Sequence, residues 1–331
     1  MKKLLGLCSA AALAVSALTL APAALAQPSQ PSNWPTKAVT LIVPFPAGGS
    51  TDAVARAIGI KLTEKTGQSF VVDNRAGATG TIGAAMLKRA APDGYTLMVT
   101  SLGPLVIVPH LMKGLPYDPL KDFDPITVAV QTPNVLVVNA ASPFKTLADL
   151  ITYEKAHPGK MSFASAGSGS SGHLNAELLW QRTGTQGLHV PYKGSSLAAN
   201  DLLAGQVDAS FQNINEGLPF IRSGKFRALA VTSDKRSAVL PDVPTFAEAG
   251  VSDAEVTSWQ AVVGPRGLPA ELRQKIQAAV VEALADPKVR QQFVSAGFEV
   301  VGNTPEQFAT FQRAEYTRWK KVIEVGKIVL E

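Results

Sequence analysis

Apolar, β-branched runs alternate with segments of helical period in this chain, and this alternation constrains the fold more than any other feature. The run "AVTLIVPF" is continuous and apolar, which is typical of a strand buried on both faces. In the segment that follows, Val54, Ile58 and Leu62 share one helical face. The β-α-β-α-β order predicts a parallel sheet with helices on both faces. The three strands predicted in this series are 38–45, 69–74 and 95–101.

A second series of strands and helices begins near residue 133. Its predicted strands are 133–140, 161–166, 187–192, 207–213 and 226–233, with helices at 146–156, 173–183, 196–205 and 216–224. A Pro- and charge-rich connection leads to one more buried strand at 258–265. Three helical segments close the chain and start at prolines, which the first turn of a helix tolerates; we expect these helices to pack back on the first sheet. This pattern predicts two α/β domains with a ligand cleft between them.

The N-terminus has the three parts of a secretory signal peptide. Lys2 and Lys3 precede the apolar run "LLGLCSAAALAVSALTL", and a small-x-small site ends at Ala26. We therefore expect export to the periplasm and cleavage after Ala26. The alternatives are a membrane anchor, which Pro22 and the cleavage site argue against, and a lipoprotein at Cys8, which lacks the small residue that such processing needs before it.

Composition excludes several function classes. Cys8 is the single cysteine and leaves with the signal, so the mature chain has no disulfide and no thiolate ligand or nucleophile. The 31 Lys and Arg against 26 Asp and Glu give a mild charge, and no basic stretch is interleaved with aromatics, so nucleic acid is not an expected partner. His110, His157 and His189 lack metal-ligand spacing and are interpreted as structural or surface residues. We expect no cofactor and no metal.

The loop "PFPAGGSTD" at 44–52 follows the first predicted strand. Gly48 and Gly49 allow backbone shapes that other residues resist, and Ser50, Thr51 and Asp52 are competent N-caps for the next helix. A ligand at the carboxyl end of a parallel strand meets free N–H groups and the positive end of a helix dipole. The alternative is an ordinary capped turn without a ligand.

The loop "ASAGSGSSGH" occupies the equivalent place in the second series. Gly167, Gly169 and Gly172 match the dinucleotide fingerprint G-x-G-x-x-G, which also needs an acidic residue at the end of the next strand. That strand ends at Tyr192 and Lys193 without an acid, so the dinucleotide interpretation fails. The nucleophile-elbow pattern G-x-S-x-G fails by register. A flexible linker is the remaining rival to an anion cradle of backbone N–H groups and serine hydroxyls.

Neither loop contains Arg or Lys. Neutral donors and two helix dipoles suit a carboxylate better than a multiply charged phosphate. The two loops together therefore predict a site that holds one small carboxylate from both sides.

Six motifs of the chain occur in the order that a known family shows. They are "WPTKAVTLIVPFPAGGSTD", "VVDNRAGATGTIGA", "PDGYTLMVTS", "FASAGSGSSGHLNAE", "VPYKGSSLAANDLLAGQVD" and "LPDVPTFAEAGV". The chain resembles the TctC/Bug family, the extracytoplasmic solute receptors of tripartite tricarboxylate transporters, over essentially all of the mature sequence. The resemblance implies a type II periplasmic-binding-protein fold, in which two doubly wound α/β domains are joined by two crossover strands. It sets the first domain at 27–130 plus 255–331 and the inserted second domain at 131–254.

The resemblance also implies the site. Its ligand-binding residues carried over by motif are Phe45, Ala47, Gly48, Gly49, Ser50, Thr51, Asp52, Ser101, Ser165, Ala166, Gly167, Ser168, Gly169, Ser170, His173, Tyr192, Lys193 and Asp208. Several have a plainer interpretation: Phe45 as core, Asp52 as a cap, His173 as a first-turn residue and Lys193 as a solvated cation. Asp208 pairs a ligand amine in one interpretation and is an ordinary turn residue in the other.

The function implied is capture rather than catalysis. The expected ligands are di- and tricarboxylates, acidic amino acids and aromatic acids, delivered to the membrane components of a tripartite tricarboxylate transporter. The receptor is expected to be a monomer that closes on its ligand by hinge motion. Two alternatives stay open: a receptor that signals to a sensor protein, and a secreted serine hydrolase.

Overall fold

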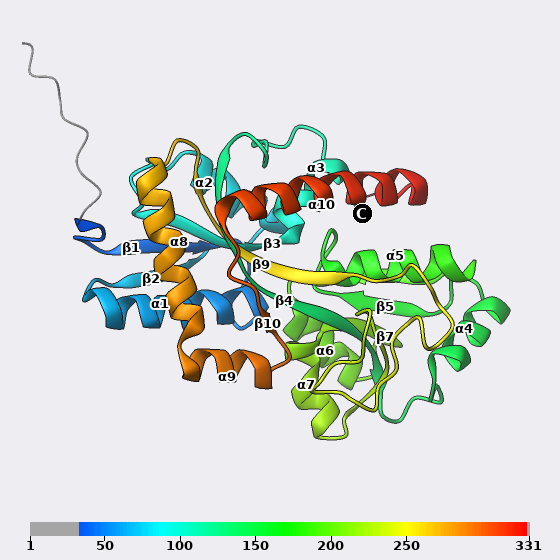
Figure 1. Ribbon diagram of the computed structural model, residues 1–331. Helices are drawn as coiled ribbons and strands as arrows, with labels where there is room; N and C mark the ends of the chain where they lie inside the picture. Colours follow the sequence, from blue (N-terminus) through cyan, green and yellow to red (C-terminus); the bar gives the residue numbers. More distant parts are fainter. Residues whose placement is uncertain (1–32, 330–331) are drawn as a thin grey trace, which may run out of the picture. The chain divides into compact units, whose positions relative to one another are not determined.

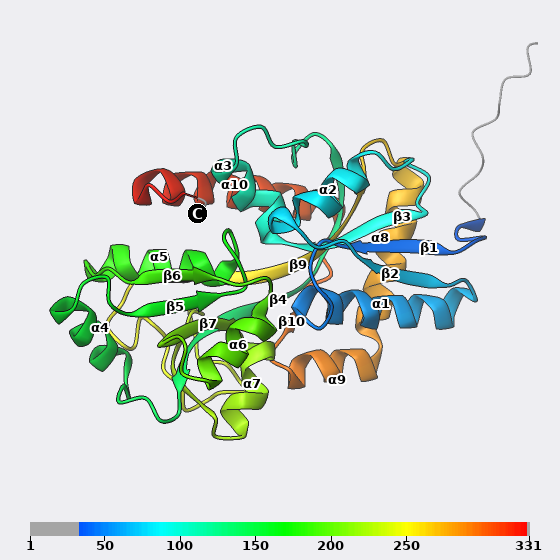
Figure 2. The same cartoon turned by 180° about the vertical axis from the view of Figure 1, so that it is seen from behind.

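The computed structural model describes residues 33–329. The predicted signal peptide and its cleavage site lie outside the described residues. Within the described part, the chain forms one extended mixed sheet flanked by helices (Figures 1 and 2). No helix in this part is long and apolar enough to cross a membrane.

The first end of the sheet is parallel, as the sequence predicts. Its strands lie in the order β2-β1-β3, and both β2 and β3 pair with β1 in parallel register. Helices α1 and α2 follow β1 and β2 and supply the crossovers. The bounds are β1 Val39–Val43, α1 Ser50–Thr66, β2 Phe70–Asn74, η2 Ala78–Gly80, α2 Thr81–Lys88 and β3 Thr96–Ser101.

Two short helices that the sequence did not predict follow β3. They are the π-helical turn η3 (Gly103–Ile107) and α3 (Val108–Leu111). Every residue of η3 is buried, so its sequence "GPLVI" has no polar positions from which a helical period can be read.

Strands β4 (Phe123–Asn139) and β9 (Thr257–Pro265) carry the sheet from one end to the other. β4 pairs with β9 over residues 123–133 and with β7 and β8 over 134–139, always antiparallel. The sequence predicted this strand only from residue 133 onward. Pro125 and Pro133 interrupt the earlier run, and the sheet accommodates the first of them at a register shift beside β9.

The far end of the sheet is again parallel. It runs β7-β5-β6, with β5 parallel to both neighbours, while β8 pairs with β4. The strands are β5 Ser162–Ser165, β6 Leu188–Pro191, β7 Ala209–Asn213 and β8 Phe226–Val231, and the helices are α4 Leu147–Ala156, α5 Ser171–Thr183, α6 Ser195–Leu203 and α7 Ile214–Arg222.

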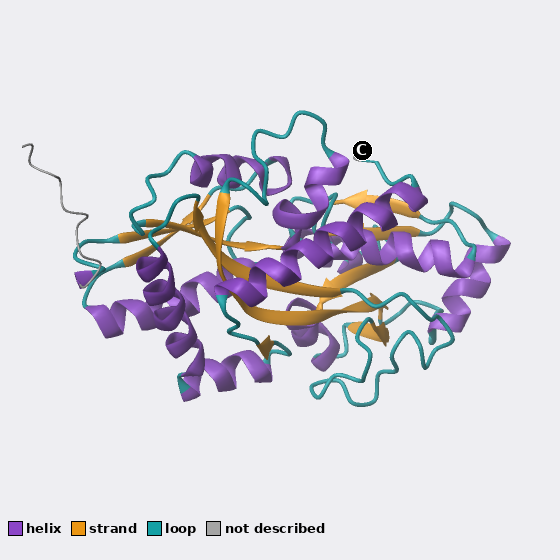
Figure 3. Ribbon diagram, turned by 45° about the horizontal axis from the view of Figure 1, so that its top comes forward, coloured by secondary structure: helices purple, strands orange, loops and turns teal. Residues whose placement is uncertain are grey.

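The C-terminal segment returns to the first end of the sheet, as the sequence predicts (Figure 1), and Figure 3 shows helices packed along the strands. Leu272 and Ile276 of α8 share a buried core with Leu41 of β1, and Trp319 of α10 shares another with Met98 of β3. The elements are α8 Ala270–Ala285, α9 Pro287–Ser295, the short strand β10 Glu299–Val300 and α10 Pro305–Gly326.

Four buried clusters fill the molecule. Two combine β1, β3 and β9 with the C-terminal helices. A third combines the second half of β4 with β5, β7 and β8, and the fourth combines it with β5, β8, α6 and α7. β4 contributes to cores of both kinds, so it links the two ends of the sheet through its own buried side chains. The loops that follow β1 and β5 leave the sheet where these two ends meet.

Candidate functional site

Each predicted loop stands at the carboxyl end of a strand and at the start of a helix. The first loop connects β1 to α1, and the second connects β5 to α5. Gly194, before α6, lies between them: its N–H donates to the carbonyl of Ala166, and a Cβ placed on it would lie 3.6 Å from Pro46 Cγ. The structure therefore brings the two loops to the same region.

Asp52 organises the first loop from within. Its carboxylate is buried and accepts hydrogen bonds from the N–H of Gly48 at 3.0 Å, from Arg56 at 2.9 Å and from Asn74 at 2.9 Å. Burial acts to raise the pKa of Asp52, but these hydrogen bonds and the Arg56 charge outweigh it and lower the pKa. The carboxylate is thus fully engaged in holding the turn, which favours the structural interpretation of Asp52.

Ser50, the first residue of α1, is held by the far end of the sheet. Its N–H donates to Glu216 Oε1 at 2.9 Å, and its hydroxyl lies 3.0 Å from the same oxygen. The hydroxyl is also 2.9 Å from Asn215 Oδ1, and it accepts from Asn213 at 2.9 Å. A protein carboxylate therefore already occupies the N-terminal dipole of α1, where the sequence predicted a ligand carboxylate.

A chain of buried polar groups supports the second loop. The N–H of Gly169 donates to Nδ1 of His173 at 3.0 Å, and the rings of His173 and His189 stack at 4.0 Å. Nε2 of His189 lies 2.7 Å from the hydroxyl of Ser165, which in turn accepts the N–H of Gly167. His173 and His189 thus act together in shaping the loop. The sequence treated them as unrelated, because residues 16 positions apart carry no spacing signal.

Both histidines are neutral at physiological pH. Burial lowers the pKa of His173 to about 3, with a further contribution from His189, and lowers the pKa of His189 to about 4. Neutral rings are needed here, because His173 Nδ1 accepts a hydrogen bond from a backbone N–H and so carries no proton.

The expected row of free backbone donors is therefore shorter than the sequence suggested. In the second loop the N–H groups of Gly167, Gly169 and Ser170 are used within the protein, and Ser170 caps α5 by accepting the N–H of His173. In the part of the chain that the structure describes, the N–H and hydroxyl of Ser168 have no partner in the hydrogen-bond network. Ser168 is half-buried and is the donor of this loop best placed to serve a ligand.

The segment Gly77 to Gly80 packs against the second loop and is absent from the predicted site residues. Four successive residues have left-handed φ angles of 132°, 45°, 55° and 88°. Two of them, Ala78 and Thr79, carry side chains that disfavour this conformation. A Cβ on Gly169 would lie 3.3 Å from Thr79 Cγ2, so this segment packs on the tip of the second loop. The glycine-bracketed string "GATG" was the available signal, and backbone strain is typical of functional sites.

The other predicted residues differ in their burial and contacts. Ser101 ends β3 and is half-buried, Phe45 packs on the first core, and Lys193 is exposed. The hydroxyl of Tyr192 donates to Asp201 at 2.7 Å, which anchors this ring to α6. Of the remaining loop residues, Ala47 and Ala166 are exposed, and Thr51 is buried at the start of α1.

Asp208 lies away from the loops. Its carboxylate accepts the N–H of Ser162 at 2.8 Å and the Ser162 hydroxyl at 2.7 Å. Ser162 starts β5 and Asp208 precedes β7, and parallel strands begin at the edge of the sheet opposite their carboxyl ends. We therefore correct the assignment of Asp208 to the ligand-binding residues: it closes the starts of two neighbouring strands.

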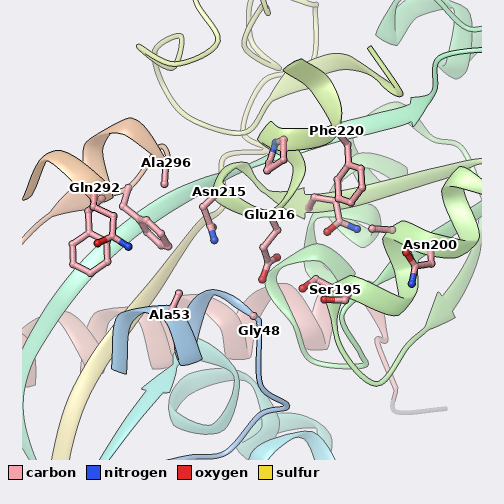
Figure 4. A pocket seen from close by; sticks show the side chains of 16 residues that line it. Gly48, Ala53, Ser195, Asn200, Asn215, Glu216, Phe220, Gln292 and Ala296 are labelled. Carbon is pink, nitrogen blue, oxygen red and sulfur yellow. The ribbon is translucent and has the colours of Figure 1, made fainter. Parts of the chain in front are cut away.

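A cavity of about 410 Å³ opens beside the first loop (Figure 4). Gly48, Gly49 and Ala53 line it from the first end of the sheet, and α9 contributes Gln292. Its remaining walls come from the first turns of α6 and α7 and from aromatic rings. The other lining residues are Ser195, Ser196, Ala199, Asn200, Gln212, Asn215, Glu216, Pro219, Phe220, Phe293, Ala296 and Phe298. This volume is in the range of small-molecule sites.

Two α/β ends joined through long shared strands, with glycine loops meeting between them, define the fold of the periplasmic binding proteins. The model of the tripartite tricarboxylate transporter family receptor, TctC, matches residues 54–328. The chain belongs to this family.

Its relatives include receptors solved with ligands. The chain is 40% identical to Protein BugT of Bordetella pertussis over 312 residues, which cover 94% of this chain and 96% of BugT. The structure of R. palustris Rpa4515 with adipate is 38% identical, has a TM-score of 0.87 and covers 90% of this chain and 100% of that chain. MatC from Rhodopseudomonas palustris with bound malate is 34% identical, has a TM-score of 0.83 and covers 88% of this chain and 100% of that chain.

Proposed function

We propose that this protein is a periplasmic receptor that captures a small carboxylate between the loops after β1 and β5. The observation that carries the proposal is the meeting of these two glycine loops, each at a helix N-terminus and neither with a basic side chain. Solved members of the family hold adipate and malate, which supports a carboxylate ligand here.

The proposal includes closure and delivery. Residues 27–130 plus 255–331 act as one domain and 131–254 as the other, and they close around the ligand at β4 and β9. The closed receptor, exported by its signal peptide and acting as a monomer, then docks on the membrane components of a tripartite tricarboxylate transporter. The family's role in such transporters supports this partner.

A thermal-shift screen over a panel of carboxylates tests the proposal. A ligand present at 100 times its Kd stabilises the folded state by about 2.7 kcal/mol, which shifts the melting temperature measurably. The matched control is the amide or alcohol of each acid, which should give no shift. A panel in which amides and alcohols stabilise the protein as well as the acids do contradicts carboxylate recognition.

A turnover assay on the same purified protein distinguishes a receptor from a hydrolase. We expect no turnover of ester or amide substrates. Ser168 has no histidine or other base in its hydrogen-bond network among the described residues, and Ser165, whose hydroxyl does face His189, is only 1% exposed. Turnover that Ser168→Ala or His173→Ala abolishes would show an enzyme instead.

A further inference from the structure

Glu216 is the charged residue of the cavity beside the first loop. The residues that line this cavity include one carboxylate, three side-chain amides besides Gln212, two serines and three phenylalanines, and no Lys, Arg or His. A ligand group that enters it therefore meets a net negative charge. In Figure 4, Glu216 extends from α7 toward the first loop at Gly48, with Asn215 beside it.

Only one oxygen of Glu216 is engaged. Oε1 accepts the N–H and faces the hydroxyl of Ser50, whereas no hydrogen bond to Oε2 is found among residues 33–329. The dipole of α1 supplies about half a positive charge, and this offsets only part of the carboxylate. Glu216 thus keeps both an open acceptor and residual negative charge on the cavity side.

Gln212 supplies a second acceptor without a donor. Its side chain is 2% exposed and lines the cavity; Nε2 donates to Ser210 at 2.7 Å, and Oε1 has no partner among the described residues. A buried acceptor left without a donor costs about 1–3 kcal/mol, so a ligand that donates to it gains affinity. Two independent acceptors, on β7 and α7, therefore call for the same kind of ligand group.

We propose that this cavity takes the ammonium end of a ligand whose carboxylate end lies against the loops. The inference rests on the proposed function and narrows its ligand class from carboxylates in general to amino carboxylates. Gly48 and Gly49 line both the first loop and the cavity, so one small molecule reaches both. An ammonium donates to Glu216 and Gln212, and the rings of Phe220, Phe293 and Phe298 line the cavity as apolar surface for the methylene chain of the ligand.

The same arrangement selects against dicarboxylates. A second ligand carboxylate in this cavity faces Glu216 without a cation between them, and close like charges repel. Glu216 is then a specificity-determining residue of this cavity.

Isothermal titration with three matched five-carbon acids tests the inference. The probes are 5-aminopentanoate, glutarate and pentanoate, which share one carboxylate and differ at the far end. The wild type should bind 5-aminopentanoate at least tenfold more tightly than glutarate. Glu216→Gln should erase this preference, Glu216→Asp should keep it in part, and Glu271→Gln, an exposed glutamate on α8, should leave it unchanged.

The ratios of the three ligand affinities distinguish a role of Glu216 in ligand selection from a purely structural role. A purely structural role of Glu216 would weaken all three ligands together and leave their ratios unaltered. A wild type that binds glutarate as tightly as 5-aminopentanoate, or that binds 5-aminopentanoate no better than pentanoate, overturns the inference. If the wild type binds glutarate and shows no preference for 5-aminopentanoate, the ammonium inference fails, but the proposed function as a carboxylate receptor stands. If the wild type binds no acid in the carboxylate panel, both the ammonium inference and the proposed receptor function fail.

Discussion

Ser50 and Glu216 join the two ends of the sheet although 166 positions separate them in the chain. The N–H of Ser50 donates to Glu216 Oε1 at 2.9 Å, and both residues stand in the first turns of their helices. Hydrogen bonds to a charged acceptor are stronger than neutral ones, and here the acceptor also faces a helix dipole. This contact therefore stabilises the approach of the start of α1 to the start of α7.

A double-mutant cycle measures the side-chain part of this contact, the Ser50 hydroxyl at 3.0 Å from Glu216 Oε1, because Ser50→Ala keeps the backbone N–H. We expect Ser50→Ala and Glu216→Gln each to lower the free energy of unfolding by about 1–2 kcal/mol, because each removes a hydrogen bond or its charge. The double mutant should lose about 1 kcal/mol less than the sum. Urea unfolding at neutral pH provides the three differences, and strict additivity would show that the Ser50 hydroxyl does not interact with the Glu216 carboxylate.

Backbone shape at the tip of the second loop should matter more than the neighbouring hydroxyl. Gly169 has φ of 77°, and its missing Cβ leaves room for Thr79 and Val108 at 3.3 and 3.4 Å. Gly169→Val is expected to lower ligand affinity far more than Ser170→Ala, which removes a cap and costs stability of about 1 kcal/mol. Calorimetry with an acid identified in the carboxylate screen checks the order, and a larger loss for Ser170→Ala would refute the argument.

The stacked histidines make stability sensitive to pH. Their folded pKa values, about 3 for His173 and about 4 for His189, lie below the ordinary 6.5. Above pH 6.5 neither the folded nor the unfolded state binds these protons. As the pH falls below 6.5 the unfolded state takes them up first, so stability falls by about 1.4 kcal/mol per pH unit for each histidine until the folded pKa is reached.

Substitution should remove that dependence. In His173→Asn the side-chain carbonyl can accept the N–H of Gly169, so we expect a shallower loss of stability between pH 6.5 and 4. His157→Asn, at an exposed ring on α4's C-terminal cap, is the control and should retain the wild-type slope. Urea midpoints measured at half-unit steps give both slopes; identical slopes in all three proteins would exclude the buried pair as the cause.

Local pattern was enough to place the parallel strands, their helices and both loops, because buried runs and glycine turns leave a signal over a few residues. The contacts that give the site its charge lie between distant segments. The sequence predicts a helix from residue 216 and gives Glu216 no role in the site, and it gives His189 no partner, since nothing near them in the sequence points to Ser50 or His173. Asp208 shows the converse error: a motif carried it into the site, while the strand direction puts it at the opposite edge.

The backbone of Thr79 is strained at the point where its side chain packs against the second loop, and this strain affects the stability of the protein. Its φ and ψ of 55° and 36° are left-handed, a region that a β-branched side chain disfavours by about 1–2 kcal/mol and that asparagine tolerates. Thr79→Asn should therefore raise the free energy of unfolding by about 0.5–1 kcal/mol in the ligand-free protein. The control Thr81→Asn, at φ of −61° in the first turn of α2, should not raise it, because no left-handed strain is relieved there.

Ligand affinity should fall in Thr79→Asn, since the methyl group that packs against Gly169 is gone. Chemical unfolding and calorimetry on the two variants check both effects, and a Thr79→Asn protein that is less stable than the wild type would mean that its surroundings, rather than strain, dominate at this position.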